Sequence, residues 1–245
     1  MQVDWYLGDT TDSLGFLQDG LVDVAITYND AAEKQSLQMG YAKRRVYAFK
    51  DHFFLVGPSA DPAQLDDAVD VLDAFNKIVT CGNRDVTTPP TDRPPTRFLS
   101  RFDKSATNIK ESQLFITIGQ VPWALAYSKW YHQYPRFPLE ALQAAAALNE
   151  YTLTDKGIWL SSPPEVTSAL RIYRRGDDYN KDPDNWLLNP GRALLGAKAV
   201  EKDLANSFLD WLIDDNGGPE VVLNFKKGDP QETVFAPVPK NERLS

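Results

Sequence analysis

The sequence has little of several residue types on which common protein functions depend. Its 245 residues include one cysteine, Cys81, which excludes an intrachain disulfide and a cysteine-rich metal site. We expect Cys81 to be a small buried residue that closes a strand. The two histidines, His52 and His132, leave little material for acid-base catalysis. We expect His52 to pack in a strand and His132 to lie at a helix end, where it would favour the helix dipole.

Long apolar runs and positive charge are also scarce. No stretch approaches the roughly 18 apolar residues that span a bilayer, and the first residues show no signal segment. The formal net charge of −8 is unfavourable for binding nucleic acid or an anionic membrane. A bound anion would therefore need a local cluster of hydrogen-bond donors. No nucleophile elbow, phosphate loop, dinucleotide fingerprint or paired-histidine motif is found, which argues against an enzyme.

The order of apolar patterns predicts an α/β protein. The chain begins with a strand, a turn, a helix and a nearly continuous apolar strand, which favours a parallel sheet covered by helices. The predicted strands are residues 3–7, 22–28, 45–56, 79–82 and 98–101. The predicted helices are residues 12–18, 65–78, 123–131, 138–148, 200–214 and 219–225, with one more that begins near Asn108.

Two breaks in composition predict the domain organisation. Residues 87–96 include four prolines within seven positions, which cannot continue a helix or a central strand. Residues 175–184 are polar and rich in turn formers. Breaks on both sides of a central block predict that one lobe is inserted into another. We place lobe I at residues 1–92 and 186–245 and the inserted lobe II at residues 93–185.

A donor-rich tract follows the predicted strand at residues 98–101. The strand would deliver the Arg101 guanidinium and the Ser100 hydroxyl to a sheet edge. Ser105, Thr107 and Asn108 would add donors at a helix N-terminus, where the helix dipole favours negative charge. The tract therefore predicts an anion site.

Structural roles also explain the same residues. Arg101 would then pair with Asp103 or another acid, and Asn108 would cap the helix with Glu111 at the capping-box position. Two other loops can likewise be interpreted either as ligand-binding loops or as purely structural ones. Residues 8–11 follow the first predicted strand, where open α/β sheets bind ligands, and residues 151–157 bring hydroxyls to a helix entry. Each of these loops is also explained as an ordinary helix cap.

A family resemblance rests on several segments in order. They are residues 54–63, the Ser100–Arg101 tract with Asp103, Ser105 and Thr107, residues 151–157, residues 187–190, and the pattern over residues 205–225. Together they resemble the tungstate-binding proteins, which are periplasmic-binding-protein-like solute receptors of tungstate ABC importers. The likeness covers nearly the whole chain, and the Tyr-Thr-Leu-Thr-Asp segment that begins at Tyr151 is its most specific part.

The resemblance implies a fold and a ligand. The fold would have two type II lobes, each a mixed, mainly parallel sheet flanked by helices. Tungstate or molybdate would bind in the cleft between the lobes, which would close by hinge motion. The ligand-binding residues implied are Arg101, Ser100, Ser105 and Thr107, together with Gly8 and Thr10, which match the region of a glycine-threonine-glycine turn.

The resemblance also implies a setting for the protein. The family's first strand and its ligand loop would precede residue 1. No cofactor is implied beyond the bound oxyanion. The expected partner is an ABC-type membrane permease, and the expected location is extracytoplasmic, either periplasmic or secreted.

Other functions stay open at this point. Hard oxygen ligands from Asp9, Asp12, Asp103 and Asp155 would suit a metal cation, and the same fold would also accept a small organic acid. A sensor or interaction protein without a transporter is a further alternative. A carboxylate-based enzyme is least favoured because no activated pair of acids is evident, so no catalytic residue is assigned.

Overall fold

The computed structural model describes residues 3–124, 126, 128–178 and 184–244. Its α-helices are α1 Thr10–Asp19, α2 Asp30–Gln38, α3 Val71–Thr87, α4 Ala106–Thr117, α5 Pro138–Leu148, α6 Lys156–Ser161, α7 Pro164–Thr167, α8 Lys202–Ile213 and α9 Gly218–Asn224. Its strands are β1 Val24–Thr27, β2 Ala42–Pro58, β3 Phe98–Ser100, β4 Tyr131–Gln133, β5 Tyr151–Asp155, β6 Leu170–Arg175, β7 Leu188–Gly196, β8 Lys226–Lys227 and β9 Glu232–Thr233. Short 3-10 helices lie at Leu65–Asp67, Pro122–Ala124 and Lys240–Glu242.

The chain divides into two compact units. Unit 1 contains Met1–Asp51, Lys104–Ala106 and Asn189–Ser245, and unit 2 contains His52–Asp103 and Thr107–Leu188. The first boundary falls within the long strand β2, so residues 52–92 group with unit 2 and not with the N-terminal lobe in which we placed them. The proline-rich segment connects α3 to β3 inside unit 2. That composition break therefore marks a loop between neighbouring elements and not a domain boundary.

The sheet of unit 1 is antiparallel where it was predicted to be parallel. Strand β1 pairs with β7, from Val24 opposite Leu195 to Thr27 opposite Arg192, and β7 lies between β1 and β2 in strand order. Residues 3–7 form no strand, so the predicted opening strand is wrong. The strand that pairs with β1 is instead β7, which is distant in sequence. Strand β7 brings the chain back to unit 1 after it has passed through unit 2.

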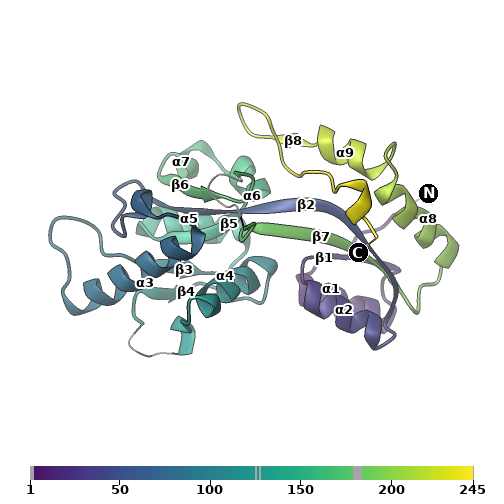
Figure 1. The fold of residues 1–245 in the computed structure, drawn as a ribbon, viewed down its shortest axis with the longest axis horizontal. Helices are drawn as coiled ribbons and strands as arrows, with labels where there is room; N and C mark the ends of the chain where they lie inside the picture. The colour runs from purple at the N-terminus through teal and green to yellow at the C-terminus, as the bar shows by residue number, and fades with distance from the viewer. Residues whose placement is uncertain (1–2, 125, 127, 179–183, 245) are drawn as a thin grey trace. The chain divides into compact units, whose positions relative to one another are not determined.

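The core of unit 1 lies on both faces of this sheet. Successive strand residues point to opposite faces, and β7 shows this directly. Leu194 packs with Leu17 of α1, whereas its neighbours Ala193 and Leu195 pack with Leu209 of α8. Helices from the two ends of the sequence thus cover opposite faces of the sheet in unit 1 (Figure 1).

Unit 2 has a mixed sheet. The second half of β2 pairs antiparallel with β5 and β6, whereas β3 pairs parallel with both β4 and β5. Helix α4 connects β3 to β4, as expected for a parallel pair, because the connection has to return along the sheet. This arrangement confirms the predicted mixed α/β class. Among the described pairs, parallel pairing is confined to β3 and its two neighbours.

Aromatic side chains fill one face of the unit 2 sheet. The Phe98 ring lies 5.7 Å from Phe75 of α3 and 5.3 Å from Phe115 of α4, between ring centroids. The next residue, Leu99, faces the other way and packs against Ala141 and Ala145 of α5. Strand β3 is therefore buried on both faces, and its end is held firmly in place.

Several predicted helices match the structure. Helix α5 has the predicted bounds, and α1, α8 and α9 lie within a few residues of theirs. The predicted helix at residues 65–78 begins later, at Val71, because Asp70 caps it by accepting a 2.7 Å hydrogen bond from Asp73 N. It also runs on to Thr87, so the strand predicted at residues 79–82 is wrong. Those apolar residues include Val79, which belongs to the buried face of the helix.

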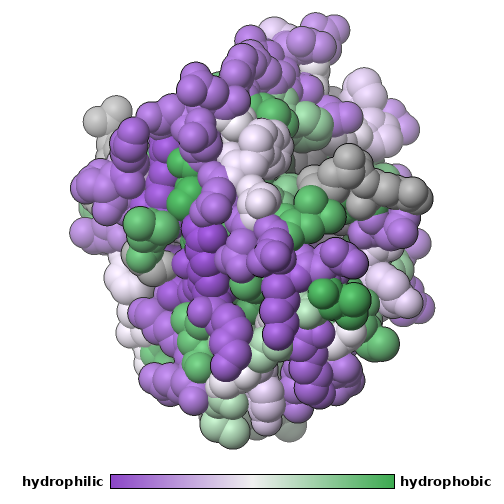
Figure 2. Space-filling model, turned by 90° about the vertical axis from the view of Figure 1, so that its right-hand side faces the viewer, coloured by the Kyte–Doolittle hydropathy of each residue, from purple (hydrophilic) through white to green (hydrophobic). Residues whose placement is uncertain are grey.

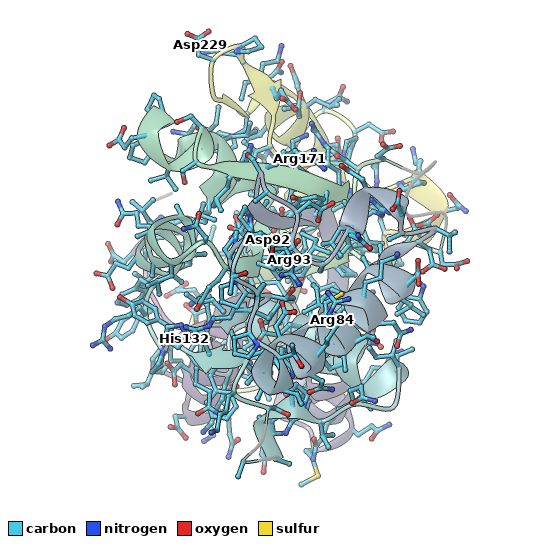
Figure 3. All side chains as sticks on the ribbon, turned by 90° about the vertical axis from the view of Figure 1, so that its left-hand side faces the viewer. Arg84, Asp92, Arg93, His132, Arg171 and Asp229 are labelled. Carbon is cyan, nitrogen blue, oxygen red and sulfur yellow. The ribbon has the colours of Figure 1, made fainter. Side chains whose placement is uncertain are left out.

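The other misassigned region precedes β4. The helix predicted at residues 123–131 is wrong, because Pro122–Ala124 form a single 3-10 turn and β4 begins at Tyr131. Residues 125 and 127 lie outside the described part of the chain, as do residues 179–183 of the second composition break. His132 consequently lies in a strand and not at a helix end, and its Nδ1 is 2.8 Å from Glu150 Oε2 (labelled in Figure 3).

The remaining predictions on single residues have mixed outcomes. His52 is buried in β2 as expected. Cys81 is buried but belongs to helix α3 and does not close a strand. No helix among the described residues is long and apolar enough to cross a bilayer. The face shown in Figure 2 is mostly hydrophilic, with separate apolar patches.

An ion pair between a buried carboxylate and a partly buried arginine fixes the proline-rich segment onto α3. Arg93 (Figure 3) donates to both carboxylate oxygens of Asp85, at 2.8 and 2.7 Å. The backbone N–H of Thr96 donates to the same carboxylate at 2.7 Å. Burial alone would raise the pKa of Asp85, but these donors hold it well below its usual range. The carboxylate thus organises the loop that leads into β3.

Replacing this carboxylate should destabilise the protein at neutral pH. Asp85→Asn leaves the Arg93 guanidinium without its charge partner, and we expect the free energy of unfolding to fall by about 3 kcal/mol. Arg84→Ala is the matched control, because the Arg84 side chain is exposed and its 3.5 Å contact with Asp85 is longer than those of Arg93. This substitution should lower the free energy of unfolding by less than about 0.5 kcal/mol. Urea denaturation at pH 7 measures both, and equal losses would contradict the assignment.

The same pair should give a pH dependence of defined sign. Because the folded-state pKa of Asp85 is lowered, its contribution to stability is complete above the ordinary pKa of about 4 and is lost as the pH falls further. The stability difference between wild type and Asp85→Asn should therefore shrink between about pH 4 and pH 2. A constant difference over that range would show that the carboxylate charge is not responsible.

A glycine in β2 makes room for a tyrosine ring. A Cβ atom at Gly57 would lie 2.1 Å from Cδ1 of Tyr151. The ring cannot easily move, because its hydroxyl donates to Asp61 Oδ1 at 2.8 Å and accepts from Ala63 N at 3.0 Å. We expect Gly57→Ala to lower the free energy of unfolding by about 1–3 kcal/mol. Gly15→Ala, in an open position of α1, should instead raise it by up to about 1 kcal/mol in the same urea assay.

Candidate functional site

Arg101 follows β3 and presents its guanidinium group at the end of that strand. Its side chain is 11% exposed. Nη2 lies 2.5 Å from Asp103 Oδ2, and Nε donates to the backbone oxygen of Arg136 at 3.2 Å. The interpretation in which Arg101 pairs with Asp103 is therefore correct for this structure. The donors in these two hydrogen bonds are Nε and Nη2 of Arg101, and Nη1 does not take part in them.

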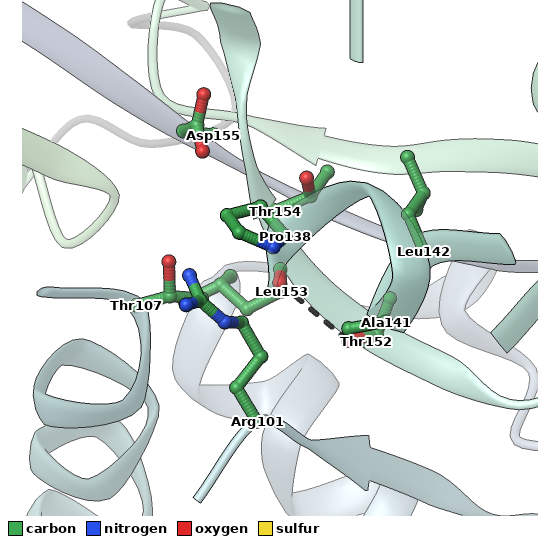
Figure 4. A pocket seen from close by; sticks show the side chains of 9 residues that line it. All are labelled: Arg101, Thr107, Pro138, Ala141, Leu142, Thr152, Leu153, Thr154 and Asp155. Carbon is green, nitrogen blue, oxygen red and sulfur yellow. Dashed lines mark hydrogen bonds between the residues drawn. The ribbon is translucent and has the colours of Figure 1, made fainter. Parts of the chain in front are cut away.

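Arg101 lines a small pocket within unit 2 (Figure 4). Polar groups come from Thr107 at the start of α4 and from Thr154 and Asp155 at the end of β5. Apolar side chains of α5 close the other side. The residues that line the pocket are Arg101, Thr107, Pro138, Ala141, Leu142, Thr152, Leu153, Thr154 and Asp155. A guanidinium and two threonine hydroxyls are suitable donors for a small anion.

The end of β5 places a carboxyl group in this pocket. Asp155 caps α6 by accepting a 2.8 Å hydrogen bond from Ile158 N, so the capping interpretation of residues 151–157 is correct for Asp155. Burial raises the pKa of Asp155, whereas the backbone donors and the charge of Arg101 oppose that effect. Thr152 donates to Leu99 O at 2.8 Å, which ties β5 to β3. The pocket thus holds one cation with acidic groups close by.

Ser100 has a structural role in this structure. Its hydroxyl is fully buried, donates to Glu111 and accepts a 3.1 Å hydrogen bond from Phe102 N. Asn108 donates from Nδ2 to Glu111 Oε1 at 2.8 Å. Asn108 lies inside the first turn of α4, so the helix-cap interpretation of this residue is wrong. We define residues 101–104 as the Arg101 loop. A buried polar cluster of Ser100, Asn108 and Glu111 is hydrogen-bonded to this loop through Phe102 N.

The other predicted ligand-binding residues belong to unit 1. Ser105 is buried in the connection to α4, and Gly8 and Thr10 lie at the entry to α1. Asp9 caps α1 through a 2.9 Å bond from Asp12 N, as the ordinary-turn interpretation predicts. A Cβ atom at Gly8 would lie 2.9 Å from Asp12 Cβ, so close packing alone explains this glycine. A ligand role for Gly8, Thr10 and Ser105 stays a prediction.

A cation site receives no support from the structure. The four aspartates considered for it are divided between the units, with Asp9 and Asp12 in unit 1 and Asp103 and Asp155 in unit 2. Asp103 binds Arg101, and Asp155 caps a helix. Within the described ranges, no group of three or more histidine, cysteine, aspartate or glutamate side chains could hold a metal ion.

Two features of the site were not predicted. The contribution of α5 to the pocket lining was not predicted, because the apolar residues of this helix also fit ordinary helix packing. Pro138, which starts the helix, is one of the residues that line the pocket. The complete burial of Glu111 was missed because glutamate three residues after a polar residue also fits a cap. The apolar residues Leu114 and Phe115, three and four positions after Glu111, were the available signal that this face of α4 points inward.

Comparison with curated proteins identifies transport-related relatives. A relative from Haloferax volcanii, whose name proposes an anion-binding component of an ABC transporter, is 26% identical over 212 residues, which cover 85% of this chain and 56% of the relative. The tungstate-binding protein TupA of Peptoclostridium acidaminophilum is 26% identical over 213 residues, 85% of this chain and 68% of that protein. The chain thus spans little more than half the length of the Haloferax relative.

Solved structures with the same fold are also similar. A periplasmic protein whose description proposes metal binding is 46% identical, with a TM-score of 0.87, over 96% of this chain and 84% of the other. The tungstate-binding protein TupA of Desulfovibrio alaskensis G20 is 26% identical, with a TM-score of 0.74, over 96% and 86%. These likenesses confirm the type II periplasmic-binding-protein-like fold class that the sequence resemblance implied. Residues 1–216 match the PBP superfamily domain, and the chain therefore belongs to the PBP superfamily.

Proposed function

We propose that this protein is a solute-binding protein for a small tetrahedral oxyanion, with tungstate or molybdate as the ligand. The observation that carries the proposal is the Arg101 guanidinium in the unit 2 pocket, beside the hydroxyl-bearing residues Thr107 and Thr154. Relatives at 26% identity are named tungstate-binding proteins, which supports the same ligand class. Because the protein's net charge is −8, any anion would need a local cluster of hydrogen-bond donors, and the Arg101 guanidinium would be part of one.

The pocket chemistry suggests how an oxyanion would be held. A guanidinium presents a planar set of N–H donors that can bind two oxygens of one anion. In the structure one of these donors binds the Asp103 carboxylate. An oxyanion would take the place of that carboxylate on the guanidinium, so Asp103 acts as an internal stand-in for the ligand. Thr107 and Thr154 would supply neutral hydroxyl donors, which bind an anion without requiring further charge.

The proposal includes the residues and partners that the resemblance implied. Ser105, Gly8 and Thr10 of unit 1 would contribute further hydroxyl and backbone donors. The protein would have no catalytic step and no cofactor besides its ligand. It would work outside the cytoplasm with an ABC-type permease, because relatives carry ABC transporter and periplasmic names. A cation ligand has no donor cluster in the described residues, and no observation favours an enzyme or an orphan sensor.

Removing the guanidinium should weaken oxyanion binding strongly. We expect isothermal titration calorimetry to detect tungstate or molybdate binding to the wild type, and Arg101→Ala to weaken it by roughly 2 kcal/mol or more, about 30-fold. Arg136→Ala is the matched control, because its exposed side chain is removed while the backbone oxygen that accepts from Arg101 remains. Sulfate and phosphate complete the panel. A folded protein that binds none of the four anions would overturn the proposed function.

A threonine in the pocket should have a smaller effect. Thr107→Val removes one neutral hydroxyl from the pocket without changing its shape, and we expect binding to weaken by about 1 kcal/mol, roughly fivefold. Thr117→Val is the control, since Thr117 is an exposed residue at the other end of α4. The same calorimetric titration measures both variants. Equal affinities for Thr107→Val and wild type would remove Thr107 from the site.

A further inference from the structure

We propose that Glu111 is a positioning residue that holds Arg101 in place for the anion, acting through Ser100 and the backbone of Phe102. The claim about the anion rests on the proposed function, whereas the claim about the loop does not. Glu111 touches neither the pocket nor the guanidinium directly in the described hydrogen bonds. Its role would be to fix the loop that carries the ligand-binding side chain.

The contacts form a continuous chain from α4 to the Arg101 loop. The Glu111 side chain is completely buried, and one of its carboxyl oxygens accepts a hydrogen bond from the Ser100 hydroxyl. Asn108, one turn earlier, donates to the same oxygen at 2.8 Å. The Ser100 hydroxyl in turn accepts from Phe102 N at 3.1 Å. Arg101 lies between Ser100 and Phe102 in sequence, so the backbone on both sides of it is attached to the cluster.

The Arg101 loop needs such an attachment because its backbone is strained. Phe102 has a φ of 45° and Lys104 a φ of 64°, in the left-handed region that residues with a Cβ atom rarely occupy. Each such residue costs on the order of 1 kcal/mol or more unless its surroundings impose the conformation. The Phe102 ring is 42% exposed, so burial of the ring gives only limited support. The hydrogen bond to Ser100 supplies a backbone restraint at this position.

The charge state of Glu111 matters for this arrangement. Burial raises the pKa of Glu111 to about 8, against the lowering effect of the Ser100 and Asn108 hydrogen bonds. Asp103 raises it further, and Arg101 lowers it. At neutral pH the group is therefore protonated and uncharged. Its second oxygen, Oε2, is buried without a hydrogen-bond partner, which is tolerable for a neutral carboxyl group and costly for a carboxylate.

Charged and titratable groups on neighbouring elements act on Glu111 in opposite directions. Tyr131 of β4 faces the cluster, and burial followed by the Glu111 charge raises the pKa of its hydroxyl, which stays protonated throughout the range of interest. The described charged groups that act on Glu111 are Arg101 and Asp103 of the loop after β3. Ionisation of Glu111 changes the charge next to the Arg101 loop in this range, and Asp155 of the unit 2 pocket is another carboxyl group whose pKa is raised by burial.

Ionisation of Glu111 should then oppose oxyanion binding. A buried negative charge near the Arg101 loop repels a dianion and attracts the guanidinium away from it. We expect tungstate affinity to fall about tenfold between pH 7 and pH 9.5, the size of a typical coupling between two sites. Glu111→Gln keeps the shape and a hydrogen-bonding amide but cannot ionise, so its affinity should stay constant over this range. Tungstate itself remains a dianion throughout.

Calorimetric titrations with sodium tungstate at pH 6.5, 7.5, 8.5 and 9.5 test this expectation. Glu140→Gln, an exposed glutamate of α5, is the matched control and should show the wild-type pH profile. Glu111→Leu removes all hydrogen bonding and should weaken binding at every pH, whereas Glu111→Gln should restore the affinity of wild type at pH 7. Identical pH profiles for wild type and Glu111→Gln would overturn the positioning role.

A measurement on the ligand-free protein separates this inference from the proposed function. We compare the amide hydrogen exchange rates of residues 101–103 in wild type and in Glu111→Gln, and take their ratio to remove the intrinsic pH dependence of exchange. This ratio should rise as the pH passes through 8. A rise in this ratio without tungstate binding would sustain the positioning role and reject the oxyanion function. If Glu111→Gln fails to fold, the reference becomes the amides of residues 226–229 in the same wild-type protein, which belong to unit 1 and not to the Glu111 cluster. No rise above that reference near pH 8 would also overturn the inference.

Discussion

The candidate site depends on where one positive charge, the Arg101 guanidinium, is placed in an acidic protein. Arg101 follows β3, a strand buried on both faces, and its side chain is only 11% exposed while it binds Asp103. A cation so enclosed has to be paired, because burying a lone charge costs several kcal/mol. The pairing that stabilises the ligand-free site is therefore the same kind of interaction that an oxyanion would offer. This is why a pocket next to two aspartates can still be an anion site.

The fold supplies the rigidity that this arrangement requires. Alternate residues of β3 pack on opposite sides, Phe98 among the aromatic rings of α3 and α4 and Leu99 against α5. The strand cannot slide without losing both sets of contacts. The ion pair between Asp85 and Arg93 fixes the loop that enters β3, and the buried cluster around Glu111 fixes the loop that leaves it. Both ends of the short strand are thus held by polar groups that are satisfied mainly within unit 2.

The sequence predicts much of the fold and part of the candidate site. Helix α5 was evident from its alanine-rich sequence, and strand β2 from an aromatic-rich apolar run that ends at Gly57 and Pro58. Helix α3 was divided wrongly, since its buried face contains Val79 and Cys81 in a short apolar run that also fits a strand. Arg101 was identified from the donor-rich tract, but the opposite roles of Ser100 and Thr107 within that tract depend on which hydroxyl points toward Glu111. Local sequence carries no information on that choice, because it is made by α4 packing against β3.

The central claim is that Arg101 holds a small oxyanion. Crystals grown with tungstate and measured at the tungsten absorption edge test it most directly, because the metal is located by its own anomalous signal. The account predicts a single strong peak within hydrogen-bonding reach of the Arg101 guanidinium through the oxyanion oxygens, with Asp103 displaced from it. A peak elsewhere, or no peak from a fully folded protein, would contradict the account.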